Sequence, residues 1–119
     1  MPEFGSSFSG LANDRKLTNA ELIRAIRFMV AAEYEATQLY MQLAESTNNK
    51  LAIAVLKDIA DEELVHVGEF LRLLHELAPD EELVHVGEFL RLLHELAPDE
   101  KKFYAKGAKE VENMIKDSK

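Results

Sequence analysis

Apolar side chains recur in a heptad rhythm along two stretches of this chain, and this rhythm constrains its fold more than any other feature. In both stretches the spacing alternates between four and three residues. Such spacing places side chains on one face of an α-helix and is typical of helices that pack along each other. No convincing strand-type alternation occurs, so the sequence predicts an all-α fold. The two seams read Leu22, Ile26, Met29, Glu33, Ala36, Tyr40, Leu43 and Leu56, Ile59, Glu63, His66, Phe70, Leu73, Leu77.

Local signals indicate where these two helices begin and end. Thr18 and Glu21 have the spacing of a capping box, which predicts a helix that starts near residue 19. Short polar side chains fill residues 46–49 and favour a loop. The second helix is predicted from about Lys50 to Leu77, because Pro79 cannot continue a helix. The sequence therefore predicts an antiparallel two-helix hairpin.

The second helix carries another apolar row beside its seam. A helix that is apolar on two rows needs more than one partner helix, which points to association between copies of this short chain. Further along, we expect a tail helix that Gly107 weakens or interrupts. Residues 1–16 begin with a Gly- and Ser-rich stretch and are expected to form a flexible leader, which leaves 17–119 as the helical domain. The second row contains Leu64, Val67, Leu71 and Leu74.

Residues 80–98 repeat residues 61–79 without a single difference, as DEELVHVGEFLRLLHELAP. Repeats that have diverged keep a pattern of residue types but not every residue. Identity therefore indicates a very recent duplication, an engineered insertion or an error of sequence assembly. Removing one 19-residue copy from the 119 residues leaves a parent of 100. We expect the second copy to form an added helix, which covers an apolar face or exchanges with a neighbouring chain.

Composition excludes several functional classes. The chain has no cysteine, which rules out a disulfide scaffold, a zinc ribbon and a cysteine nucleophile, and leaves the cytoplasm as the default location. Acidic residues outnumber basic ones 22 to 14, for a net charge of -8. Such a surface repels nucleic acid and anionic membranes and attracts cations. No apolar run has the length of a membrane span. We therefore expect no nucleic-acid or membrane partner.

Three polar residues occupy seam positions, namely Glu33, Glu63 and His66. A charge at such a position is costly unless it is paired or bound to a metal ion. Glu63 and His66 are three residues apart, so both can reach one ion from one helix face. Glu33 lies 15 residues before Asn48, near the middle of the loop, and Glu63 lies 15 residues after it. The hairpin thus presents two carboxylates and one imidazole at one height.

These three ligands make half of the arrangement found in ferritin-like di-iron sites. Such sites take one Glu from each of two helices and a Glu-x-x-His pair from each of the other two. A dimer that closes through the seam would complete the set. Carboxylate-rich sites with one imidazole per metal favour iron or manganese. Tyr40 lies seven residues after Glu33 on the same face and could hydrogen-bond a ligating carboxylate. Alternatively, the seam polar residues only specify helix register.

The second copy carries its own pair, Glu82 and His85. His66 lies 13 residues before Pro79 and His85 only six after it, an offset of roughly 10 Å along a helix. The two pairs therefore cannot share an ion across a tight turn. We assign the site to the first copy and keep Glu82 and His85 as a stray or alternative metal site. In the reverse assignment the second copy would supply the site and the first copy would form a bulge. Its Glu-x-x-His pair would then reach the level of Glu33 only if the loop were rebuilt. The other histidines lie off the seam and are expected at the surface: His75 and His94.

The segments that carry these residues resemble the encapsulated ferritin family. The likeness covers about residues 17–115 with one copy removed, and it extends to rubrerythrins and ferritins. It implies a two-helix hairpin with a short third helix, which dimerises into a ferritin-like four-helix bundle and assembles into a ring-shaped decamer. It also implies iron ligation by Glu33, Glu63 and His66, with Tyr40 in support. The matching segments are Ala32-Glu33, Glu35-Ala36, Leu39-Tyr40, Asp61-Glu62-Glu63 and His66-Val67-Gly68-Glu69-Phe70.

The resemblance implies a di-iron ferroxidase that oxidises Fe²⁺ with dioxygen. Its family works in the cytoplasm inside an encapsulin compartment, with the shell protein as partner, and stores iron there. Two other functions remain open. A rubrerythrin-like peroxidase would need a separate electron donor, because the chain has no cysteine. A duplicated or engineered helical assembly variant would have altered oligomerisation and reduced or no activity.

Overall fold

The computed structural model describes residues 12, 14–79 and 84–118, without the side chains of 84–87. These residues form four α-helices, one 3₁₀ turn and no strand, which confirms the all-α prediction. None of the described helices is long and apolar enough to cross a membrane. The elements are α1 (Asn19–Glu45), α2 (Lys50–Leu77), α3 (Val84–Leu96), η1 (Pro98–Glu100) and α4 (Lys101–Asp117).

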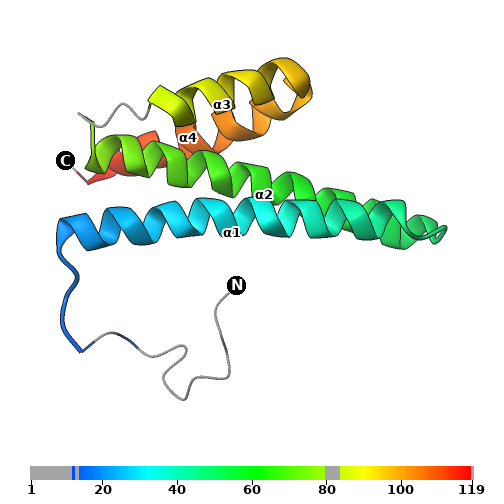
Figure 1. Ribbon diagram of the computed structural model, residues 1–119, viewed down its shortest axis with the longest axis horizontal. Helices are drawn as coiled ribbons and strands as arrows, with labels where there is room; N and C mark the ends of the chain where they lie inside the picture. Colours follow the sequence, from blue (N-terminus) through cyan, green and yellow to red (C-terminus); the bar gives the residue numbers. More distant parts are fainter. Residues whose placement is uncertain (1–11, 13, 80–83, 119) are drawn as a thin grey trace.

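Helices α1 and α2 form the predicted antiparallel hairpin (Figure 1). The capping box at the start of α1 is present. The Glu21 backbone N–H donates to the Thr18 hydroxyl at 3.2 Å, and the Thr18 N–H donates to the Glu21 carboxylate at 2.9 Å. After the loop, the side chain of Asn49 accepts a hydrogen bond from the Ala52 N–H and caps α2. Side-chain caps thus fix the start of both long helices.

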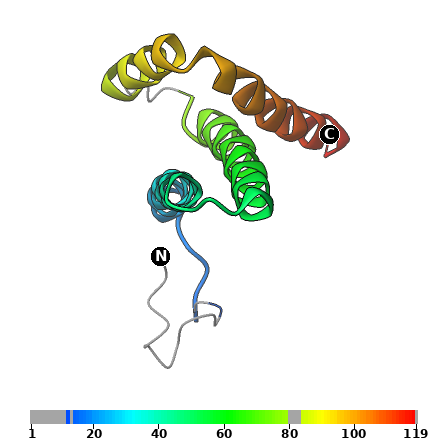
Figure 2. The same cartoon turned by 90° about the vertical axis from the view of Figure 1, so that its right-hand side faces the viewer.

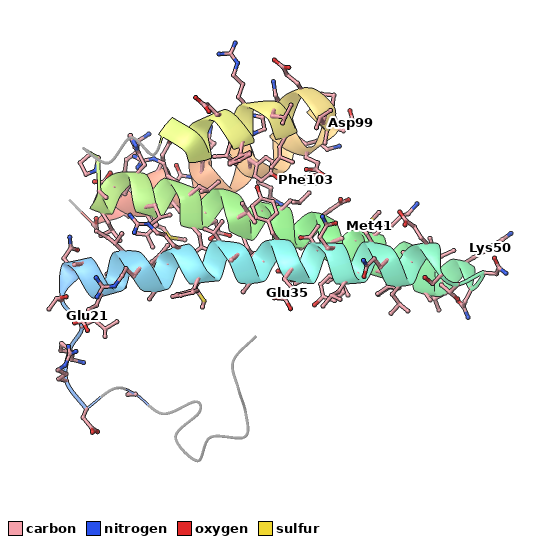
Figure 3. All side chains as sticks on the ribbon, viewed as in Figure 1. Glu21, Glu35, Met41, Lys50, Asp99 and Phe103 are labelled. Carbon is pink, nitrogen blue, oxygen red and sulfur yellow. The ribbon has the colours of Figure 1, made fainter. Side chains whose placement is uncertain are left out.

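Helix α2 packs between α1 and α4, and α3 and α4 diverge on the side of α2 away from α1 (Figures 1 and 2). Helix α3 runs in the opposite direction to α2 without packing along it, and the chain bends at Pro98, beside the labelled Asp99 in Figure 3. Helix α4 then runs in the same direction as α2. An ion pair between Arg72 and Glu112, with N and O 3.5 Å apart, joins the later parts of these two helices.

The core lies where α1, α2 and α4 meet. Leu64, Val67 and Tyr104 are buried there, and Val67 has no exposed surface. Phe103, labelled in Figure 3, and three residues of α1 and α2 pack around them. The second apolar row of α2 is therefore covered by α4 of the same chain. The expectation that α2 needs more than one partner helix is confirmed, because α1 and α4 both pack on it. Since α4 belongs to the same chain, this row does not require a second copy, and association between copies stays a prediction. The three surrounding residues are Val30, Tyr34 and Leu71.

Gly107 does not interrupt the tail helix, contrary to the sequence prediction, since α4 is continuous from Lys101 to Asp117. Its role is close packing. A Cβ atom on Gly107 would meet the carbonyl oxygen of Val65 and lie 2.7 Å from the Glu69 nitrogen. A Cβ atom on Gly68 would lie 2.8 Å from the Tyr104 Cα. The two glycines let the backbones of α2 and α4 touch, and this contact offsets the low helix propensity of glycine.

The second copy forms a helix, α3, as expected. It rests on η1, and the His94 ring lies 5.4 Å from the ring of Tyr104. His94 is therefore half-buried rather than at the surface as predicted, whereas His75 is exposed. The prediction that this helix covers an apolar face is confirmed at Tyr104. Of its own apolar residues, Leu90 and Leu93 are half-buried, whereas Phe89 is 67% and Leu96 73% exposed.

Candidate metal centre

The structure brings together the three seam residues Glu33, Glu63 and His66. Glu33 comes from the middle of α1 and the other two from α2. One potential ligand atom of each lies within 4.8 Å of the others. His66 Nδ1 is 3.6 Å from Glu33 Oε1 and 3.5 Å from Glu63 Oε2. When several donor atoms each lie about 2.0–2.2 Å from one ion, the distances between those atoms are of this size. The three residues can therefore share a cation.

The cluster is half-open. The side chains of Glu33 and Glu63 are 21% and 16% exposed, whereas that of His66 is 48% exposed. His66 and Gly68 are two residues apart, so they project roughly 200° apart around α2. Because α4 packs at Gly68, the ligand cluster faces away from α4. It lies on the outer surface of the α1–α2 hairpin, where a second molecule can approach.

The backbone around Glu33 is held by a local contact. The hydroxyl of Thr37 donates to the Glu33 carbonyl at 2.9 Å, and Thr37 is buried. Nearby, Glu69 is half-buried beside α4 rather than in the cluster. Burial raises the pKa of Glu69, and repulsion from Glu110 adds to this effect.

The other predicted site residues are not brought into the cluster. Tyr40 is half-buried on α1, and within the described residues its hydroxyl makes no hydrogen bond to Glu33 or Glu63. Its supporting role stays a prediction. Glu82 lies outside the described residues. His85 belongs to α3, but its side chain is not described, so metal binding by this pair also stays a prediction.

Sequence reasoning missed a tyrosine pair that ties α1 to α4. The Tyr34 hydroxyl donates to the Tyr104 hydroxyl at 3.0 Å, and Tyr104 donates to the Glu100 carboxylate at 3.4 Å. Burial raises the pKa of both tyrosines, so the pair stays protonated. The only signal in the sequence is that Tyr34 follows Glu33. Its partner is 70 residues away, and no local pattern links the two.

Comparison with known proteins agrees with this architecture. The family model for rubrerythrin matches residues 25–117. A ferritin-like–encapsulin shell fusion protein of Pyrococcus furiosus is 39% identical over 66 residues, which are 56% of this chain and 19% of that protein. The encapsulin nanocompartment cargo protein EncC of Myxococcus xanthus is 40% identical over 65 residues, 55% of this chain and 50% of that protein. The chain thus spans half or less of these curated relatives.

A solved structure is similar over most of its length. The encapsulated ferritin domain of Pyrococcus furiosus superposes with a TM-score of 0.63 at 30% identity, and the match covers 81% of this chain and 97% of that domain. The family model, the two encapsulin-associated relatives and this fold agree with one another. The chain therefore belongs to the rubrerythrin family of ferritin-like helical proteins, and its fold is similar to that of an encapsulated ferritin domain.

Proposed function

We propose that the chain is a ferroxidase subunit whose di-iron centre forms between two copies. The observation that carries this proposal is the convergence of Glu33, Glu63 and His66 on the outer surface of the hairpin. One chain offers two carboxylates and one imidazole. Two chains offer four carboxylates and two imidazoles, the ligand set of ferritin-like di-iron sites.

The residues fit iron by the chemistry of their donor atoms. Carboxylate oxygens and a single imidazole per ion suit divalent iron, and no thiolate is present to favour zinc or copper. Bound iron supplies the electrons that pass to dioxygen. The chain holds the ions, with Glu33 and Glu63 neutralising their charge. His66 must be neutral to bind, so metal binding competes with its protonation. Tyr40 would support a ligand carboxylate of the completed site.

The location of this activity is also a proposal. The names of the two curated relatives refer to an encapsulin shell and to encapsulin cargo. We infer that this chain works as cargo of an encapsulin compartment in the cytoplasm, where the oxidised iron is stored. The shell protein is then its partner, and the chain acts as a dimer at least.

The test is a pair of neighbouring substitutions on α2. Glu63→Ala removes a ligand, and we expect it to abolish Fe²⁺ oxidation, followed by ferric absorbance and by dioxygen uptake. Glu62→Ala removes an exposed carboxylate beside it and should leave the rate unchanged. Circular dichroism establishes that both variants are folded. Normal turnover by folded Glu63→Ala, or consumption of hydrogen peroxide much faster than dioxygen, would reject the ferroxidase assignment.

A further inference from the structure

Helix α3 carries an apolar stripe that nothing in the described chain covers. The stripe consists of Phe89, Leu92 and Leu96, whose side chains are 67%, 50% and 73% exposed. Their spacing of three and four residues puts them on one helix face. Glu88 and Glu95 lie along one edge of that face. The stripe is therefore an exposed apolar surface with an acidic border.

Two apolar hollows on the described surface could receive such a stripe. The first lies between α2 and α4, where Phe70, Leu73 and Met114 are among its lining residues and Glu69 stands at its border. The second lies on α1 and is lined by Arg24, Arg27, Phe28 and Ala31. Phe28 there is 72% exposed.

The two hollows differ in the charge of the residues that line them. The acidic border of the stripe would approach Glu69 at the first hollow, and like charges in an interface are costly. At the second hollow Glu95 would approach the guanidinium group of Arg24, and guanidinium groups bind carboxylates well. In a chain of net charge -8, few surfaces attract an acidic helix. The hollow on α1 is thus the complementary one.

Within one chain the stripe does not meet the α1 hollow, because α3 lies apart from α1 in both views (Figures 1 and 2). The hollow can therefore receive the stripe of another molecule. We propose that the stripe Phe89–Leu92–Leu96 docks on the Arg24–Ala31 face of α1 in a second copy. Phe28 then packs on the stripe, and Glu95 pairs with Arg24.

This contact is independent of the proposed metal centre. Ala31 and Glu33 project roughly 200° apart around α1, so one copy can dock at the hollow while another closes the metal site. The docking joins two different surfaces, and such head-to-tail contacts build rings or open chains. The duplicate would therefore add a second kind of contact to the assembly.

The first experiment uses the full chain in analytical ultracentrifugation over a range of concentrations. Leu92→Asp places a charge in the middle of the stripe at an exposed position, so α3 should still fold, which circular dichroism checks. We expect the concentration needed for the larger assembly to rise at least about tenfold, as for a central interface residue. Lys109→Glu on the exposed face of α4 is the control and should change nothing. An unchanged mass distribution for folded Leu92→Asp would overturn the proposal.

The second experiment identifies the occupant by exchanging charges. Glu95→Lys alone and Arg24→Glu alone should each weaken the assembly, and the double variant should restore it. If Leu92→Asp weakens the assembly while Arg24→Glu has no effect, the stripe binds another surface and the α1 assignment is wrong. Fe²⁺ oxidation by the same variants keeps the two proposals apart, because loss of docking leaves the ligands of the metal centre in place.

Discussion

Residues 65–77 of α2 and residues 84–96 of α3 have the same sequence and different surroundings. Both are helical, as the shared pattern dictates. In α2, Val67 is fully buried and Phe70 is half-buried, whereas Phe89, the copy of Phe70, is 67% exposed in α3. The local sequence therefore determines the helix, and the neighbouring elements determine which of its faces are buried.

The neighbours that distinguish α2 are α1 on one face and α4 on another. Helix α1 supplies Glu33 opposite the Glu-x-x-His pair, and α4 supplies Gly107 opposite Gly68. Helix α3 has η1 and the Tyr104 ring instead. Matched substitutions in the two copies should therefore have unequal effects.

The largest difference is expected at the two histidines of the Glu-x-x-His pairs. His66→Ala removes one of the three proposed ligands, and Fe²⁺ affinity should fall by more than about a hundredfold, because loss of a supporting residue alone costs 10–100-fold. His85→Ala should leave the affinity unchanged, since the assigned site uses the first copy. Anaerobic calorimetric titration with Fe²⁺ measures both. Equal losses in the two variants would mean that both copies bind metal.

The next difference concerns the paired glycines. Gly68→Ala forces a Cβ atom against the Tyr104 backbone, and we expect the free energy of unfolding to fall by about 1–3 kcal/mol. Gly87→Ala makes the same change in α3, where better helix propensity should raise stability by up to about 1 kcal/mol. Urea unfolding followed by circular dichroism compares them. Losses of equal size in the two variants would show that the close approach to Tyr104 does not explain the effect at Gly68.

Tyr104 makes hydrogen bonds with Tyr34 and Glu100 and a ring contact with His94 of α3, and comparing these contacts gives the third test. Tyr104→Phe removes the hydrogen bonds to Tyr34 and Glu100, which should cost about 1–2 kcal/mol. His94→Ala removes only the ring contact from α3 and should cost less, under about 1 kcal/mol. Both values come from thermal unfolding. A larger loss for His94→Ala would show that α3 contributes more to the fold than its few contacts indicate.

The smallest effect is expected at the start of α1. Arg15 and the Thr18 N–H hold the pKa of Glu21 down, to about 2. A depressed pKa stabilises the fold at pH values above the ordinary carboxyl range, and this gain disappears as the pH falls toward 2. Glu21→Gln should therefore lower the melting temperature slightly at pH 7 and not at pH 2. Glu62→Gln, at an exposed position of α2, is the control and should leave the melting temperature at pH 7 unchanged. A constant offset for Glu21→Gln across this range would exclude a role for its charge.

The sequence predicted the parts of the fold that depend on local signals. The capping box, the loop at 46–49 and Pro79 gave the bounds of α1 and α2, and the equal distances from the loop placed Glu33 opposite Glu63. It failed at Gly107, because propensity describes an isolated helix and this glycine faces another backbone. The Tyr34–Tyr104 bond was also missed, since no periodicity reports a contact between residues so far apart.

The direction of α4 depends on how many copies of the repeat precede it. Each copy of the repeat ends in a proline and adds one reversal of the chain, so the polarity of the last helix depends on whether the number of copies is odd or even. With two copies α4 leaves the molecule at the end where α2 finishes (Figure 1). A single copy would send it toward the opposite end. A duplication of this kind therefore preserves the hairpin that carries Glu33, Glu63 and His66 and inverts the polarity of the tail.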